Sequence, residues 1–149
     1  MKKLILSVLL IPAVFSAQQT VSRDAEIANY VSQVSADSLK SHINKLVSFG
    51  TRHTMSSTTD AKKGIGAARN WVLSKFKNYA KNTDGRMEVF LQSQTIQPDG
   101  KRINQPTDLG NAIAILRGTD PNDKRIFMIG GHLDSRVSDV MNAKDFAPG

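Results

Sequence analysis

The sequence predicts an α/β fold, in which helices pack on a sheet of buried strands. In the first half of the chain, apolar residues recur three and four positions apart, which is the spacing of one face of a helix. In the second half, residues 111–116 and 126–129 form short, continuous apolar runs bounded by Gly and Asp. Such runs are typical of strands buried on both faces of a sheet that has helices on either side. Helices followed by buried strands therefore predict an α/β sandwich.

Three helices are expected before the first strand. The first covers residues 24–34. The second begins with Asp37 as N-cap and stops at Gly50, and the third, the longest, begins at Asp60 and ends at residues 82–85. Their apolar stripes comprise Ile27, Tyr30, Val31 and Val34, then Leu39, Ile43, Leu46 and Val47, then Ile65, Ala68, Val72, Phe76 and Tyr79.

Three strands are expected after the helices. Residues 87–92 alternate between apolar and more polar positions, and the Pro-Asp-Gly sequence at 98–100 is typical of a turn. Residues 111–116 form the second strand and residues 125–131 the third. No helix follows the third strand, so we expect the sheet to be incomplete in this chain. The outer edge and one face of that strand are then expected to lack partners and to expose apolar surface.

Composition excludes several classes of function. The chain has no cysteine, which rules out disulfides, thiol catalysis and cysteine-ligated zinc. Any metal must therefore bind His, Asp or Glu, a ligand set that suits hydrolytic zinc. The formal net charge is +7, but the basic residues are scattered and no nucleic-acid-binding motif accompanies them. We interpret them as a solvated surface and expect no nucleic-acid partner.

The N-terminus has the layout of a secretory signal peptide over residues 1–17. A basic start at residues 2–3 precedes an apolar run at 4–15, which ends in Ser16 and Ala17. Cleavage after either of these two residues fits the pattern. The apolar run is shorter than the about 20 residues that span a bilayer. We expect export to the periplasm or the extracellular space, with no stable membrane span after removal of the signal. The alternative is a buried N-terminal core helix.

His132 and Asp134 are the candidate functional residues. They follow the third predicted strand through Gly130 and Gly131, at the carboxyl end where ligands gather in open α/β sheets. Two positions apart in extended chain, their side chains point to the same side. A carboxylate–imidazole hydrogen bond would fix the tautomer and leave the other ring nitrogen free for a metal. The alternative is a histidine that caps a turn through Asp134.

Residues 129–135, Ile-Gly-Gly-His-Leu-Asp-Ser, followed by Ala-Pro-Gly at 147–149, closely resemble the exported two-zinc aminopeptidases of metallopeptidase family 28, of the bacterial leucyl aminopeptidase type. Residues 46–53 and the helix through Gly66 and Trp71 are similar to the same family, so the resemblance covers residues 35 to 149. It implies a three-layer α/β sandwich of the zinc-aminopeptidase type, with helices around a mixed sheet, incomplete in this chain.

The resemblance also assigns roles. His132 matches a zinc ligand of the family, and Asp134 matches the aspartate that orients this histidine. The bridging aspartate, the general-base glutamate and the remaining ligands would lie beyond Gly149 and are absent. Residues 18–149 are therefore expected to be the N-terminal part of a zinc aminopeptidase domain, truncated before the bridging ligand. A complete domain would hold two zinc ions, which this part is not expected to bind tightly.

The resemblance implies a metallopeptidase that hydrolyses N-terminal residues from peptides with free N-termini, although this chain alone is expected to be inactive. One alternative is a non-catalytic exported domain of the same fold that binds peptide or protein. Another is a glutaminyl cyclase of the same fold. The intact His132 and Asp134 favour an enzyme over the binding domain. The Gly-Gly-His-Leu-Asp-Ser and Ala-Pro-Gly sequences favour an aminopeptidase over a cyclase.

Other polar residues are assigned structural roles. His42 lies at the edge of a helical stripe, and His53 is expected to form a hydrogen bond within a loop. Asp139 and Asp145, in a loop that varies within the family, are interpreted as solvated carboxylates. Arg52 is expected to pair with a carboxylate or carbonyl and so close its loop, and Trp71 is expected to lie in the core.

Overall fold

The computed structural model describes residues 22–149, so the predicted signal peptide at 1–17 lies outside the described residues. The chain divides into two compact units, residues 1–35 and 36–149. The described part of the first unit contains helix α1 (Ala25–Ser32). Asp24 is its N-cap, because the carboxylate accepts hydrogen bonds from the backbone N–H groups of Glu26 (2.8 Å) and Ile27 (3.2 Å). The helix predicted at residues 24–34 is thus confirmed.

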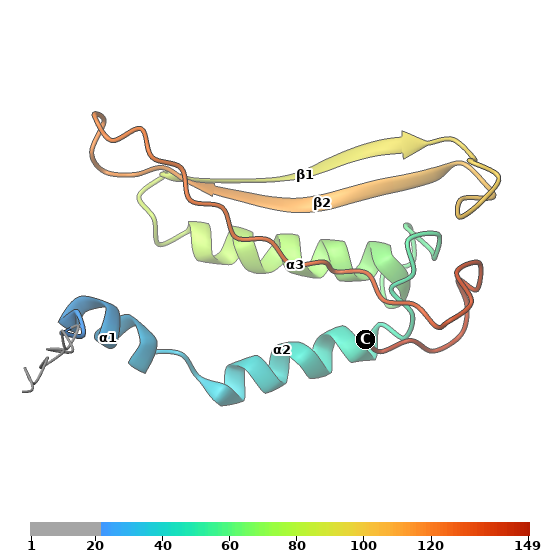
Figure 1. The fold of residues 1–149 in the computed structure, drawn as a ribbon, viewed down its shortest axis with the longest axis horizontal. Coiled ribbons are helices and arrows are strands. Elements are labelled where there is room, and N and C mark those ends of the chain that lie inside the picture. Colours follow the sequence, from blue (N-terminus) through green and yellow to red (C-terminus); the bar gives the residue numbers. More distant parts are fainter. Residues whose placement is uncertain (1–21) are drawn as a thin grey trace, which may run out of the picture. The chain divides into compact units, whose positions relative to one another are not determined.

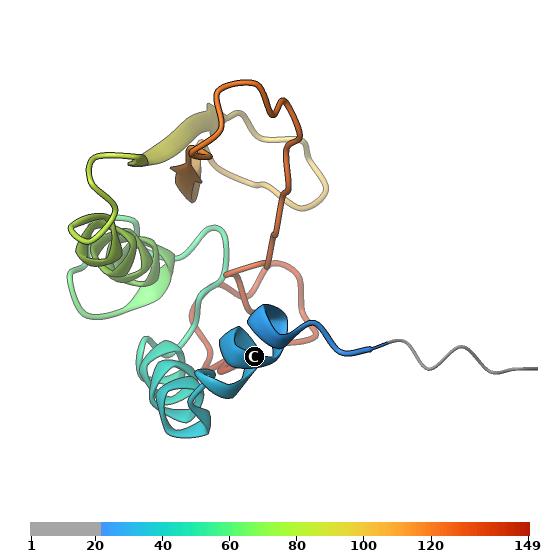
Figure 2. The same cartoon turned by 90° about the vertical axis from the view of Figure 1, so that its left-hand side faces the viewer.

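The second unit contains two helices and one β-hairpin. These are α2 (Ala36–Ser48), α3 (Gly64–Ala80), β1 (Met87–Ile96) and β2 (Thr107–Leu116) (Figure 1). The strands are antiparallel, with Met87 opposite Leu116 and Ile96 opposite Thr107. Helix α3 packs along the hairpin, as the two views in Figures 1 and 2 show. No helix within residues 22–149 is long and apolar enough to cross a membrane.

The helix starts differ from the predicted ones. Asp37 lies in the first turn of α2 rather than at its N-cap, and α3 begins at Gly64 rather than Asp60. Asp60 instead closes a turn, because its carboxylate accepts hydrogen bonds from the backbone N–H groups of Lys62 and Lys63. The predicted end of α2 is confirmed: Gly50, at φ +75°, donates its N–H to the Val47 carbonyl just past the last helical residue.

The hairpin is longer than the sequence predicted. β1 extends to Ile96 and β2 begins at Thr107, whereas alternation predicted only residues 87–92 and the apolar run only 111–116. The added pairs are mostly polar and partly exposed, so hydrophobic patterning did not reveal them. Their pairing depends on the turn that the Pro-Asp-Gly sequence predicted, in which Asp99 donates its N–H to the carbonyl of Ile103.

The predicted third strand is wrong for this structure. Residues 125–131 form no strand, and Ile126, Phe127, Met128 and Ile129 are between 84% and 99% exposed. A strand buried on both faces needs neighbouring strands and covering helices. No described segment supplies these neighbours to residues 125–131. The exposed apolar surface was expected. The hairpin is the sheet of the described residues, and a three-layer sandwich stays a prediction.

The core lies where the end of α2 meets the start of α3. Phe49, Ala67 and Ala68 are buried together, with Leu46, Trp71 and Leu133 packed against them. The Trp71 ring also meets the His42 ring edge-on, with 5.6 Å between centroids. Trp71 is therefore a core-packing residue, as predicted. Leu133 brings the segment that carries His132 and Asp134 onto this core.

Candidate functional site

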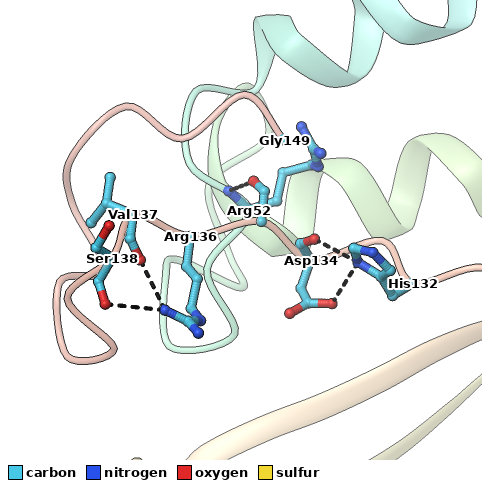
Figure 3. Close-up of a pocket in the computed structure, with 8 residues that line it drawn as sticks. Arg52, His132, Asp134, Arg136, Val137, Ser138 and Gly149 are labelled. Carbon is cyan, nitrogen blue, oxygen red and sulfur yellow. Dashed lines mark hydrogen bonds and ion pairs between the residues drawn. The ribbon is translucent and has the colours of Figure 1, made fainter.

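His132 and Asp134 face each other, as their spacing predicted. The Nδ1 atom of His132 lies 3.0 Å from the Asp134 carbonyl oxygen and 3.3 Å from its Oδ1 (Figure 3). The histidine side chain is 87% exposed, and its Nε2 contacts no hydrogen-bond partner among residues 22–149. A ring whose Nδ1–H is donated to Asp134 presents the Nε2 lone pair to solvent, which is the form that binds metals.

Asp134 is followed by a buried serine that joins two segments. Ser135 accepts a hydrogen bond at Oγ from the Arg52 backbone N–H (3.2 Å) and donates its own N–H to the Arg52 carbonyl (3.3 Å). Its hydroxyl also donates to the carbonyl of Ala147. Donor and acceptor capacities of this hydroxyl are thus both used. Ser135 belongs to the motif at residues 129–135, but nothing in the sequence indicated these contacts.

The Arg52 side chain lies beside the same segment. Its Nε donates to the Leu133 carbonyl at 2.8 Å, and its Nη1 donates to the carbonyls of Leu46 (2.9 Å) and Pro148 (2.8 Å). Burial lowers the pKa of the Arg52 guanidinium, and the Asp134 charge opposes this shift. The expectation that Arg52 pairs with a carboxylate or carbonyl is confirmed, because its guanidinium donates to three backbone carbonyls.

His53 is buried and holds a loop. Its Nδ1 accepts a hydrogen bond from the Met55 backbone N–H, and its Nε2 donates to the Val140 carbonyl, both at 3.0 Å. Because both ring nitrogens are engaged, the ring is the neutral Nε2–H tautomer and has no nitrogen left for a metal. The predicted loop hydrogen bond is confirmed. Asp139 and Asp145 are exposed, as predicted.

Arg52, His132, Asp134 and Ser135 border an open hollow of about 760 Å³ (Figure 3). Its lining comprises Arg52, His132, Asp134, Ser135, Arg136, Val137, Ser138 and Gly149. Among residues 22–149 there is no cluster of three or more His, Asp or Glu side chains that could hold a metal ion. Zinc takes four ligands, three of them from protein in catalytic sites. The described donors therefore do not fit a zinc ion by themselves, and His132 as a zinc ligand stays a prediction.

Comparison with known proteins gives a consistent set of relatives. The chain is 43% identical over 126 residues to a protein of Leptosphaeria maculans, 41% over 126 residues to one of Pyricularia oryzae, and 42% over 127 residues to one of Pyrenophora tritici-repentis. All three are named probable zinc metalloproteases. Each alignment covers 85% of this chain but only 29%, 25% and 29% of the respective relative.

The comparisons support a class of protein rather than a particular activity. The names of the relatives describe zinc proteases and do not mention an aminopeptidase, a two-zinc centre or export. No family model matches the chain. No solved structure matches it either. The chain is thus similar to part of fungal proteins that are named probable zinc metalloproteases, and the bacterial aminopeptidase type stays a prediction.

Proposed function

We propose that the protein is a zinc-dependent peptidase to which this chain contributes His132 as a metal ligand. The observation that carries the proposal is the His132–Asp134 pair at the hollow, with Nδ1 held and Nε2 open. The similarity to probable zinc metalloproteases over 85% of the chain supports it. Bound zinc activates water and polarises a carbonyl in hydrolases of this kind.

Each of the two residues has a separate task. Asp134 accepts the Nδ1–H of His132 through its carboxylate or its backbone carbonyl, which selects one tautomer and limits rotation of the ring. His132 then presents a neutral Nε2 at the edge of the hollow. The remaining ligands and the general base are not among the described residues. This chain therefore supplies one histidine ligand, held in position by Asp134, and part of the lining of the hollow.

We further propose that the substrate is a peptide with a free N-terminus and that the reaction removes N-terminal residues. This finer assignment depends on the resemblance of residues 129–135 and 147–149 to the two-zinc aminopeptidases. Two zinc ions per complete domain follow from the same resemblance. The signal-like residues 1–17 support export to the periplasm or the extracellular space.

The test compares variants in the full-length gene product. His132→Ala should lower zinc affinity and peptidase activity by more than the about 10–100-fold typical of losing an outer partner, whereas Asp134→Asn should fall within that range. Asp139→Asn, an exposed carboxylate change in the neighbouring loop, is the control and should leave both quantities unchanged. Zinc content, activity on free peptides and activity on N-acetylated peptides are measured for each.

Two results would contradict the proposal at different levels. Unchanged zinc affinity in His132→Ala would remove the metal role and favour a non-catalytic domain that binds peptide or protein. Equal hydrolysis of free and N-acetylated peptides would keep the zinc peptidase but reject the aminopeptidase assignment.

A further inference from the structure

We propose that Arg52 is a positioning residue for the His132–Asp134 pair, and that Arg52 and Ser135 form a clasp which fixes residues 133–135 and 147–148 against the end of α2. The name Arg52–Ser135 clasp is used below for these two residues and their hydrogen bonds. The clasp is a property of the fold. Its importance for catalysis rests on the proposed function.

The Arg52 guanidinium connects three separate parts of the chain. Nη1 bonds the carbonyls of Leu46, in the last turns of α2, and of Pro148, while Nε bonds the carbonyl of Leu133. Leu133 lies between His132 and Asp134, so the guanidinium bonds the peptide group that links Leu133 to Asp134. Hydrogen bonds from a charged donor contribute more than neutral ones.

The second half of the clasp is formed by backbone groups and the Ser135 hydroxyl. The backbones of Arg52 and Ser135 approach closely, with Ser135 N–H donating to the Arg52 carbonyl and Arg52 N–H donating to Ser135 Oγ. The same hydroxyl donates to Ala147. All three residues are buried, with exposures of 6% for Arg52, 7% for Ser135 and 4% for Ala147. Breaking one bond here leaves a buried polar group unsatisfied, which costs more than at the surface.

On the N-terminal side of His132, the chain makes no restraining contact with any part of residues 22–149. The preceding residues 126–129 are almost fully exposed, and Cβ atoms placed on Gly130 or Gly131 would meet nothing within 4 Å. The ring itself bonds only Asp134 among the described residues. The backbone of the pair is therefore held from its C-terminal side, by the clasp and by the Leu133 side chain on the core.

A guanidinium is suited to this task in a way that an ammonium is not. Its donors lie in one plane with fixed directions, so a single side chain can reach the Leu133, Leu46 and Pro148 carbonyls together. Lysine keeps the charge and the apolar stem but concentrates its donors at one atom. Arg52→Lys should therefore keep most of the burial while losing part of the connection.

The experiment uses metal-free full-length protein and follows two readouts by NMR, amide hydrogen exchange and the tautomer of the His132 imidazole. In Arg52→Lys, exchange of the backbone amides of residue 52 and Ser135, whose N–H groups bond Ser135 Oγ and the carbonyl of residue 52, should accelerate by about ten- to hundredfold, as expected when a hydrogen bond to a charged group no longer holds this contact. The His132 ring should lose its Nδ1–H preference. Amides of the β1–β2 hairpin should keep their wild-type rates.

Two further variants make the test specific. Arg86→Lys is the matched control, because the Arg86 guanidinium also bonds a backbone carbonyl, that of Arg117 (2.7 Å), but in an exposed position away from the hollow. It should change neither readout. Ser135→Ala removes the hydroxyl that accepts the Arg52 N–H and should accelerate exchange of the Arg52 amide, which keeps the test valid if Arg52→Lys unfolds the unit.

The inference is overturned if exchange of the residue 52 and Ser135 amides and the His132 tautomer stay at wild-type values in Arg52→Lys. In zinc-loaded enzyme, a true positioning role should lower kcat with little change in KM. If His132→Ala abolishes zinc binding while Arg52→Lys changes neither readout, the proposed function stands and the clasp fails. If His132→Ala leaves zinc binding intact while the Arg52→Lys readouts change, the clasp stands and the proposed function fails.

Discussion

Gly66 shows how closely single residues are packed at the start of α3. The residue lies in the first turn of the helix, and its N–H donates to the Ser57 carbonyl at 3.0 Å. A Cβ atom placed on Gly66 would overlap with the backbone of Thr58. Because the obstacle is backbone rather than the end of a flexible side chain, the loop before α3 would have to move to admit it.

This contact predicts that Gly66→Ala destabilises the protein, although replacing glycine by alanine within a helix usually stabilises it. Alanine in place of glycine normally favours a helix by about 1 kcal/mol. We expect Gly66→Ala to lower the free energy of unfolding instead, by about 1–3 kcal/mol, as overpacking does. Chemical denaturation of the full-length protein measures the change. Gly118→Ala is the control, because its Cβ would meet nothing within 4 Å; equal stability of both variants would contradict the prediction.

At the residue scale, the sequence predicted pairs that are close along the chain and missed contacts between distant segments. The approach of the Asp134 carboxylate to the His132 ring follows from their two-residue spacing, because alternation puts both side chains on one side. The hydrogen bond from the ring to the Asp134 backbone carbonyl did not follow from that alternation. The partners of Arg52 could not be named in advance. They are backbone carbonyls, which every residue carries, so the choice of Leu133 and Pro148 depends on the fold.

At the scale of elements, the turn of the β1–β2 hairpin is organised by one carboxylate. Asp99 Oδ1 accepts hydrogen bonds from the backbone N–H groups of Lys101 and Arg102 at 2.8 Å and of Ile103 at 2.9 Å. These donors, that of Ile103 most strongly, lower the pKa of Asp99. The ionised carboxylate therefore stabilises the turn.

The lowered pKa gives a direction to the pH dependence of the hairpin. A carboxyl group whose pKa is lower in the folded state contributes stability that is present above its unfolded value of about 3.9 and is lost as the pH falls through the folded value. We expect the protection factors of the Lys101, Arg102 and Ile103 amides, which compare the intrinsic with the observed exchange rate, to fall as the pH drops through that acidic range. In Asp99→Asn this fall should be absent, and the protection factors should already be lower at neutral pH. Identical pH profiles for the two proteins would contradict the assignment.

The helices were the more predictable elements, and the last strand was the least. The apolar stripes of α2 and α3 repeat over several turns, so local spacing identifies them. A continuous apolar run such as residues 126–129 lacks any periodicity that requires a strand, and its conformation depends on which neighbours are present. The same run was correctly expected to expose apolar surface.

At the scale of the whole molecule, the described core is small. Phe49, Ala67 and Ala68 form its centre, and no large side chain within residues 22–149 is fully buried. Apolar side chains are exposed in residues 126–129 and along one side of α1. Large exposed apolar patches promote association in soluble proteins.

We therefore expect isolated residues 18–149 to be poorly soluble and to unfold without a sharp thermal transition. Met128→Lys should raise solubility, because the Met128 side chain is 90% exposed. Met55→Lys is the matched control: Met55 is 8% exposed, so a charge there should lower stability further. Calorimetry and the concentration of soluble protein provide the measurements. A sharp cooperative transition in wild-type 18–149 would contradict this prediction.

The bond between the Ser135 hydroxyl and the Ala147 carbonyl ties the two ends of residues 136–146 together. A loop closed at its neck can change length at small entropic cost, about 0.6 kcal/mol for each doubling. Val137 and Ser138 of this loop line the hollow, whereas His132 lies before the neck. Insertions or substitutions beyond the neck can therefore reshape this wall of the hollow while His132 keeps its place. The shape of the hollow and the position of the histidine are thereby independent of each other.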